Sequence, residues 1–397
     1  MAKSPSVLIV GASIAGPALA FWLGRAGWDV TVIEKAPRPR PGGQAVDFRT
    51  PSHFKVLGAM GVLPALQALA TGGCAMRFVD NRGRTKARLS EEFAGGELEV
   101  QRGDLSRVLV EAGRGRIDYR FGHGLSELTQ HPDHVEARCD NGWTGRFDFV
   151  VGADGIHSRT RRLALGASYE TYMGYYLAGW EAPGLDCPPN EASYVNRPGR
   201  AIGIGPGRAG TPPNGRAFFA APESAEARGS LAEQKRFVLR QLHGLGWRAP
   251  ELIALLEATD DLFLSPISHV DPPAWSAGRV ALLGDAACGA TLGGMGTGTA
   301  ILGAYVLAGE LLGSPTDHTA AFARYQQRLQ PMARALSANG GRAGMFHAPR
   351  TRRGLWFRNT MLGIPAIQRW MIEQASQMGD DIELPDYAGL GTMMEAA

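Results

Sequence analysis

The stretch from residue 6 to residue 34 constrains the fold more than any other part of the chain. An apolar, β-branched run from Val7 to Val10 breaks at Gly11, which is typical of a buried parallel strand. Apolar residues then recur every three or four positions as far as Gly24, which predicts a helix. A second apolar run, Val30 to Ile33, ends at Glu34, which lies 34 − 11 = 23 positions beyond the first glycine. The motif expects an acid about 20 positions on. This order predicts a βαβ unit that binds a dinucleotide.

Each polar or glycine position of this unit has a physical role. Gly11 permits a tight turn, Gly16 lets the helix pack closely on the strand, and the free N–H groups at the helix start attract a pyrophosphate. Glu34 can accept hydrogen bonds from ribose hydroxyls. Ser13 stands where a second glycine is expected, so its side chain must point away from the phosphates or hydrogen-bond to them. A signal peptide or membrane anchor is the alternative, and it leaves the glycines and the spaced acid unexplained.

Composition narrows the class of protein. A chain of 397 residues, 44% hydrophobic, can bury a large core and is expected to form two or three domains. The formal charge of +3 gives no electrostatic reason for a nucleic-acid or anionic-membrane partner, so a small-molecule substrate is expected. The four cysteines show no paired spacing, which predicts neither a metal site nor disulfides and fits a reducing cytoplasm.

Two later apolar runs also lead into glycine turns. Phe149 to Val151 runs into the sequence Gly-Ala-Asp-Gly at 152–155, and Val280 to Leu283 runs into Gly284 and Asp285. A glycine-rich loop follows at 292–298 and opens a helix whose buried face consists of small residues and leucines. Near the first unit, the Pro- and Gly-rich loop 36–43 lets backbone approach a ligand.

The remaining segments predict a second layer. Residues 76–80 and 85–89 predict a hairpin, and residues 117–120, 134–139 and 143–148 alternate in the manner of a β-meander. Irregular strands, aromatic residues and turns between 172 and 263 predict a sheet that covers the substrate.

The three glycine turns together carry a family resemblance. The chain resembles a class A flavoprotein monooxygenase of the p-hydroxybenzoate hydroxylase type. In length and in sequence pattern it is similar to tetracycline-inactivating monooxygenases. The first match is residues 11–16 with Glu34, the second is the D-G-x-x-S-x-x-R pattern of residues 154–161, and the third is Gly284-Asp285 with its glycine loop. These matches span residues 6–313.

The resemblance implies an α/β fold with a Rossmann-like FAD-binding domain, an interleaved β-sheet substrate domain and a C-terminal helical layer. We expect residues 1–70, 98–170 and 266–345 in the FAD-binding domain. Residues 71–97 and 171–265 are expected in the substrate-binding domain, and 346–397 in the C-terminal helical segment. The oligomeric state is expected to be a monomer or a homodimer.

The resemblance also assigns residues to the cofactor. It implies that Glu34 holds the adenosine ribose of FAD, Arg102 contacts the phosphate or ribityl region, Asp285 binds the ribityl chain and Asp154 lies near the pyrophosphate. The predicted cofactor-contacting residues are Gly11, Ser13, Ile14, Ala15, Gly16, Glu34, Lys35, Gly43, Gln44, Arg102, Asp154, Gly284, Asp285, Gly294, Met295, Gly296, Thr297 and Gly298. Two positions depart from the family: Cys288 stands where histidine is common, and Gly298 stands where asparagine is frequent.

The implied activity is that of a monooxygenase with noncovalent FAD, NADPH or NADH as reductant, and O2. A flavin C4a-hydroperoxide would oxygenate an aromatic or polyketide-like molecule. Asp47 and Arg49 are the residues expected to line the active site, while His157 and His269 are more typical of surface or loop residues. An aromatic substrate pocket is one interpretation of Tyr175, Tyr176, Trp180, Phe218 and Phe219, and core packing explains each of them almost as well.

Other activities remain open at this point. One is a flavin-dependent reductase or halogenase on the same fold, although the halogenase pattern W-x-W-x-I-P is absent from the sequence. Another is a ligand-sequestering protein without turnover.

Overall fold

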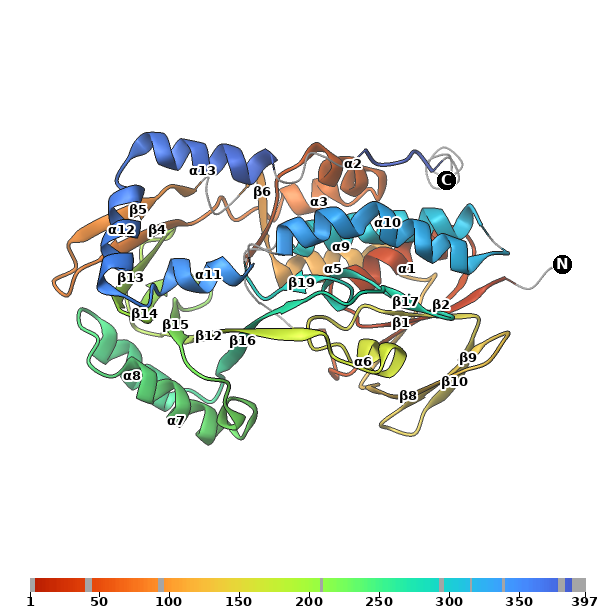
Figure 1. The fold of residues 1–397 in the computed structure, drawn as a ribbon, viewed down its shortest axis with the longest axis horizontal. Coiled ribbons are helices and arrows are strands. Elements are labelled where there is room, and N and C mark those ends of the chain that lie inside the picture. Colours follow the sequence, from red (N-terminus) through yellow and green to blue (C-terminus); the bar gives the residue numbers. More distant parts are fainter. Residues whose placement is uncertain are drawn as a thin grey trace.

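A computed structural model of the chain describes residues 4–39, 45–91, 96–207, 210–292, 296–314, 316–337, 340–377 and 383–387. Two large β-sheets lie along the long axis of the molecule (Figure 1). The first has six strands and the second has eight. This mixed α/β architecture is the predicted fold class, while the residue boundaries of the two domains stay a prediction.

The six-stranded sheet has the order β17-β18-β11-β1-β2-β7. Its strands are β1 (Ser6–Val10), β2 (Asp29–Glu34), β7 (Asp118–Phe121), β11 (Phe149–Gly152), β17 (Ser276–Ala277) and β18 (Val280–Leu282). Neighbouring strands are parallel except for β17 and β18. The three apolar runs of the sequence are therefore adjacent strands, β18, β11 and β1. Because parallel strands end at the same edge of a sheet, their three glycine turns meet there.

Alternate residues of β1 enter two different cores. Val7 and Ile9 pack in the main core, which is built with helices, while Leu8 and Val10 face a small three-stranded sheet on the other side. The helices of the main core are α1 (Ala15–Arg25), α2 (Pro51–Ala59), α3 (Leu63–Gln67), α5 (Arg102–Ala112), α9 (Gly296–Leu312) and α10 (His318–Ser337). Both faces of the sheet are covered, which explains why its strands read as continuous apolar runs.

The eight-stranded sheet has the order β19-β16-β12-β15-β14-β13-β4-β5. Its strands are β4 (Ala75–Val79), β5 (Thr85–Leu89), β12 (Glu170–Glu181), β13 (Glu191–Arg197), β14 (Arg200–Gly205), β15 (Asn214–Ala220), β16 (Phe263–Val270) and β19 (Gly289–Ala290). The predicted hairpin at 76–89 is present as β4 and β5, and β4 pairs in parallel with β13. A separate two-stranded antiparallel sheet consists of β3 (Ala45–Phe48) and β6 (Leu98–Gln101).

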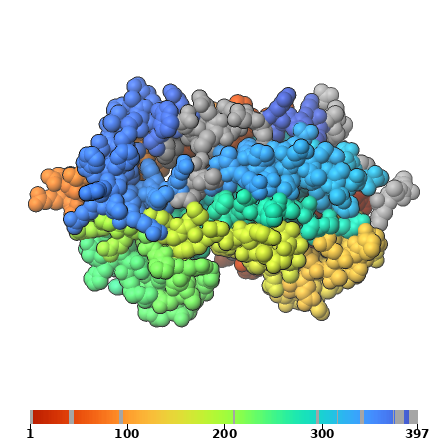
Figure 2. Space-filling view, viewed as in Figure 1, coloured from red at the N-terminus to blue at the C-terminus, as the bar shows by residue number. Residues whose placement is uncertain are grey.

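Helices cover both faces of this second sheet. Helices α7 (Leu231–Leu242) and α8 (Ala249–Ala258) pack on one face, and the segment around α11 (Gly340–His347) and α12 (Arg352–Leu362) packs on the other. Helix α13 (Pro365–Gln377) follows and completes the C-terminal helical layer. Figure 2 shows an indentation between the α7–α8 lobe and the lobe of the three-stranded sheet. No helix within the described ranges has the length and apolar character needed to cross a membrane.

One predicted element is wrong. Residues 117–120 were expected to open a β-meander, but β7 instead pairs in parallel with β2 at the edge of the six-stranded sheet. The meander consists of β8 (Leu125–Gln130), β9 (Val135–Cys139) and β10 (Thr144–Phe147). An edge strand with one solvent-exposed face alternates apolar and polar residues in either sheet. The alternation alone therefore could not show which strand β7 pairs with.

We expect Gly16→Ala to disrupt the folding of the nucleotide unit, because a side-chain carbon at Gly16 would overlap the carbonyl oxygen of Gly11. Gly58→Ala is the matched control, since Gly58 is also helical and nothing lies within 4 Å of its added carbon. It should stabilise the chain by about 0.5–1 kcal/mol. Thermal unfolding of both variants tests this, and equal stability would contradict it.

Candidate active site

The first and second glycine turns are in direct backbone contact. Gly11 adopts a φ of 112°, and its N–H donates to the carbonyl oxygen of Ile33 at 2.7 Å. A side chain at Gly11 would overlap the carbonyl of Ala153 and come within 3.1 Å of the amide nitrogen of Asp154. Glycine is therefore required here by both its backbone angle and the close approach of β11.

Glu34 closes this turn at the end of β2. Its Oε2 accepts from the N–H of Ala12 at 3.1 Å, and its Oε1 accepts from the N–H of Ala36 at 2.9 Å. A carboxylate oxygen accepts more than one hydrogen bond, so both can still receive hydroxyl groups. Lys35 is exposed beside it. The arrangement fits the predicted contact with a ribose.

Ser13 faces helix α5 across the turn. The guanidinium of Arg102 donates to Ser13 Oγ at 3.3 Å, and Ser106 Oγ donates to the carbonyl of Ala12 at 3.2 Å. The serine that departs from the glycine pattern thus lies beside an exposed cation. This pair places a positive charge and a hydroxyl next to the free N–H groups at the start of α1, as an anionic diphosphate requires.

The carboxylate of Asp154 accepts hydrogen bonds from the start of the helix that follows it. It accepts from the N–H groups of Arg159 and Thr160 at 2.8 and 2.9 Å, and from the hydroxyls of Ser158 and Thr160. It therefore binds the start of α6 (Arg159–Leu165), and only its backbone lies against the first turn. The proximity of Asp154 to a pyrophosphate stays a prediction.

Arg161 joins the second motif to the third, a role that sequence reasoning missed. Its side chain is fully buried and donates to the carbonyls of Ile156 at 2.6 Å, Ala286 at 3.0 Å and Ser168. Burial lowers the pKa of Arg161, with Asp154 and Glu170 opposing the shift. The only sequence signal was its position at the end of the D-G-x-x-S-x-x-R pattern. Arg161 positions the turn that carries Asp285.

Asp285 is the clearest candidate for a ligand contact. It lies deep in the protein, although part of the residue still reaches solvent. Desolvation raises its pKa, and the positive charge of Arg102 partly opposes this. No hydrogen-bond donor to its carboxylate is found among the described residues. An enclosed acceptor without a donor fits a ligand hydroxyl, which is what the ribityl chain of FAD offers.

The start of α9 lies against Asp285. A side-chain carbon at Gly296 would come 2.7 Å from Asp285 Oδ1, so only glycine allows this approach. Gly284, Gly298 and Thr297 belong to the same region, at the start of α9 or the turn before it. Gly294 and Met295, like Gly43 and Gln44, lie outside the described residues.

His53 occupies the space that a side chain at Gly298 would need. A carbon added at Gly298 would overlap the imidazole Nε2 of His53. Burial lowers the pKa of His53 to about 4, so the ring is neutral at physiological pH. Its Nδ1 accepts from the N–H groups of Arg49 and Thr50, both at 3.4 Å, so the proton is assigned to Nε2. Sequence reasoning missed His53, whose only signal is its place three residues after Thr50 at the start of α2.

Asp47 and Arg49 form an ion pair next to this histidine. Glu99 on β6 stands opposite Asp47 on β3, and its carboxylate accepts from the hydroxyl of Thr71. Desolvation raises the pKa of Glu99, and the nearby charge of Asp47 adds to the shift. A lining role for Asp47 and Arg49 stays a prediction.

The other suggested residues serve packing or local contacts. The aromatic side chains proposed for a substrate pocket are all buried in the cores on the two faces of the eight-stranded sheet, so the core interpretation holds. Trp180 Nε1, for example, donates to the carbonyl of Leu252 at 3.1 Å. His157 is exposed and pairs with Glu170, while His269 hydrogen-bonds to Ser337 on α10 at 3.0 Å.

Comparison with known proteins identifies the family of this chain. The family described as "FAD binding domain" matches residues 4–339. The chain belongs to this family. It is a flavin-dependent monooxygenase, because it is 34% identical over 352 residues to a flavin-dependent monooxygenase of an unknown prokaryotic organism, covering 86% of this chain and 89% of the relative.

Two further relatives of this monooxygenase span nearly its whole length. The flavin-dependent monooxygenase eupH of Phoma sp is 34% identical over 430 residues, covering 98% of this chain and 99% of the relative. The crystal structure of tetracycline destructase Tet(55) superimposes with a TM-score of 0.82 at 32% identity, covering 98% of this chain and all of that one. The family match thus supports FAD binding, and the three glycine turns stay the predicted site for it.

We expect Asp285→Ala to weaken FAD binding about tenfold to over a hundredfold, since a hydrogen bond to a charged group contributes about 1.5–3 kcal/mol. The same change should stabilise the protein without FAD at pH values above the raised pKa of Asp285. There the folded state holds a desolvated, ionised carboxylate, and removing it removes that cost. This gain should fade as the pH falls and the folded-state carboxyl takes up its proton.

Flavin fluorescence titration and thermal unfolding across pH measure the two effects. Asp260→Ala, which removes an exposed loop carboxylate, is the control. Unchanged FAD affinity in Asp285→Ala would remove Asp285 from the site.

We expect Gly298→Ala to destabilise the chain by about 1–3 kcal/mol, because the new methyl group meets the ring of His53. In a His53→Ala background the same substitution should cost much less, since the ring is gone. A double-mutant cycle on thermal or urea unfolding measures this coupling. Additive effects of the two changes would show that the two residues do not compete for this space.

Proposed function

We propose that this monooxygenase transfers one atom of O2 to an aromatic or polyketide-like small molecule, with NADPH or NADH as the reductant. The observation that carries the proposal is the meeting of Asp285 with the start of α9 in a cleft of the FAD-binding family. FAD, when bound, supplies the hydride acceptance and the activation of oxygen. The likeness to tetracycline destructase Tet(55) supports a polycyclic, oxygen-rich substrate.

The residues of the chain would hold and orient the cofactor. Glu34 would receive the ribose hydroxyls, Ser13 and Arg102 the diphosphate, and Asp285 a hydroxyl of the ribityl chain. The N–H groups at the start of α9 carry the positive end of the helix dipole. In this position they would favour negative charge on the nearby part of the ligand.

Noncovalent binding of FAD is supported by the state of Cys288. This thiol is buried, shares a contact with Ser337 Oγ at 3.4 Å, and has its pKa raised to about 11, chiefly by burial. A protonated, enclosed thiol is a poor nucleophile. We therefore infer that Cys288 does not attach to the flavin.

A side wall of the substrate site is proposed at strand β3. The Asp47–Arg49 ion pair, with Glu99 opposite, provides charged groups close to His53 and the start of α9. Because His53 is neutral and donates through Nε2, it can hydrogen-bond to a carbonyl or phenolate without adding charge. This polar wall fits a substrate that carries several oxygen atoms.

The test is product analysis with isotopically labelled dioxygen. The flavin-loaded enzyme is incubated with NADPH or NADH and a panel of polycyclic phenols that includes tetracyclines. We expect NAD(P)H consumption that depends on substrate, and a product that carries one labelled oxygen atom. Asp285→Ala, assayed at limiting FAD, should form less product in proportion to its lost flavin. Reduced product without any label would instead indicate a reductase, and binding without NAD(P)H consumption would indicate a sequestering protein.

A further inference from the structure

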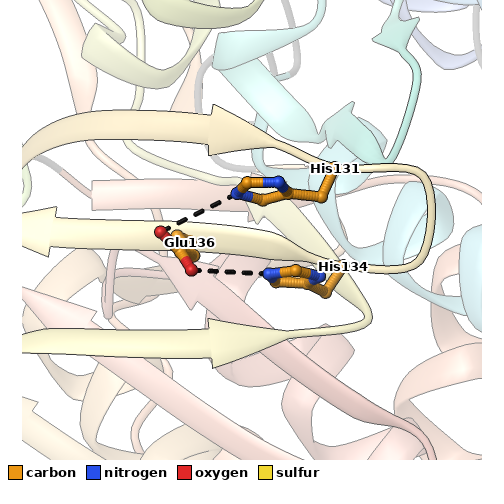
Figure 3. Close-up of side chains that lie close together, drawn as sticks. All are labelled: His131, His134 and Glu136. Carbon is orange, nitrogen blue, oxygen red and sulfur yellow. Dashed lines mark hydrogen bonds and ion pairs between the residues drawn. The ribbon is translucent and has the colours of Figure 1, made fainter.

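Two histidines and a glutamate meet at a turn outside the flavin cleft. His131 and His134 flank the turn between β8 and β9, and Glu136 lies on the exposed face of β9 (Figure 3). One ligand atom from each of the three lies within 4.8 Å of the others. The flavin interpretation assigns this cluster no task.

Both imidazoles direct a nitrogen at the same carboxylate. His134 Nε2 lies 3.5 Å from Glu136 Oε1, and His131 Nε2 lies 3.8 Å from Glu136 Oε2. The two rings are stacked, with their centroids 4.2 Å apart and their planes inclined by 7°. Figure 3 shows that the three side chains converge from the turn and from β9.

The hydrogen bonding of this cluster is incomplete. His134 Nδ1 lies 2.7 Å from Asp133 Oδ1, and a carboxylate can only accept, so Nδ1 carries a proton. The Nε2 of a neutral His134 is then an acceptor that faces another acceptor on Glu136. His131 Nε2 is enclosed and has no hydrogen-bond partner within the described part of the chain. A cation among these atoms would satisfy all of them at once.

The surroundings hold the ligands in place. A histidine that binds a metal usually donates its other nitrogen to a carboxylate, as His134 does to Asp133. Asp133 also forms an exposed ion pair with Arg146 at 2.9 Å. The turn itself is held by Arg279, whose guanidinium donates to the carbonyl of Pro132 at 2.6 and 2.9 Å. The cluster is therefore pre-organised by groups outside it.

We propose that His131, His134 and Glu136 bind one divalent transition-metal ion of the zinc class. Two imidazoles and a carboxylate are a ligand set that zinc accepts, with metal–ligand distances of about 2.0–2.2 Å. Ligand atoms around such an ion lie about 3.4 Å apart. Because an imidazole donates in its own plane, the two parallel rings would have to tilt toward each other to close the site. Magnesium and calcium, which prefer all-oxygen sites, would bind poorly. The ion would join the β8–β9 turn to β9.

The competing explanation is that protons, and no metal, occupy these nitrogens. Two imidazolium rings beside Glu136 would form solvent-screened ion pairs, which contribute little to stability. The two explanations differ in zinc uptake, because only the metal site binds a stoichiometric ion.

The experiment uses the flavin-loaded, tag-free chain after treatment with a chelator. Zinc chloride is titrated at about pH 7.5 by calorimetry, and bound metal is measured by mass spectrometry after dialysis. We expect one zinc per chain in the wild type and a higher unfolding midpoint with zinc. His131→Ala combined with His134→Ala should weaken zinc binding more than about tenfold and abolish the shift. FAD affinity should be unchanged in this variant.

The matched control is His243→Ala, which removes an exposed imidazole elsewhere. It should bind zinc as the wild type does. Zinc uptake equal to wild type in the double variant would place the ion at another group, such as a cysteine, and would overturn the proposal. Absence of stoichiometric zinc in the wild type would overturn it in favour of the protonated cluster. Glu136→Gln, which keeps the size of the side chain, tests the third ligand without the risk of a lost fold.

Discussion

The close approach of two backbone turns is the constraint on which the flavin site depends. The carbonyl of Ala153 lies where a side chain of Gly11 would be, so the ends of β1 and β11 can touch. Residues 14–16 at the start of α1 are buried beside this contact, and Ser13 before them is partly exposed. Glu34 then closes the turn from the other side by accepting the N–H of Ala12. The N–H groups at the start of α1 remain the predicted anion-binding groups, and the turn before them depends on the missing side chain of Gly11.

The third turn is connected to the others by a buried arginine. Arg161 belongs to the second motif but donates to the carbonyl of Ala286, one residue after Asp285. A buried guanidinium is costly unless every donor has a partner, and here its partners are backbone carbonyls of the turns themselves. Movement of the second turn would therefore carry the third with it. This coupling explains how segments far apart in sequence keep one ligand-binding geometry.

The binding site also carries an energetic cost in the free protein. Asp285 keeps a desolvated carboxylate with no donor among the described residues, and the nearby Arg102 compensates only in part. Such a group destabilises the free protein, and the predicted ligand hydroxyl would relieve this cost. His53 differs from Asp285 because burial lowers its pKa and keeps the ring neutral beside Gly298. Burial thus acts in opposite directions on the two pKa values: it raises that of Asp285 and lowers that of His53, and both shifts favour the uncharged form.

The sequence by itself determined the local units and their order. Apolar runs ending in glycine turns predicted β1, β11 and β18, and the spacing to Glu34 predicted the nucleotide fold, because strand periodicity and backbone freedom are local properties. It could not place β7, since an alternating edge strand suits either sheet. Only the tertiary structure brought His53 against Gly298, Arg161 to Ala286, and His131 beside Glu136. The last cluster spans only a turn, yet its geometry depends on the register of β8 and β9. Contacts between distant segments follow from packing and register, which no local pattern encodes.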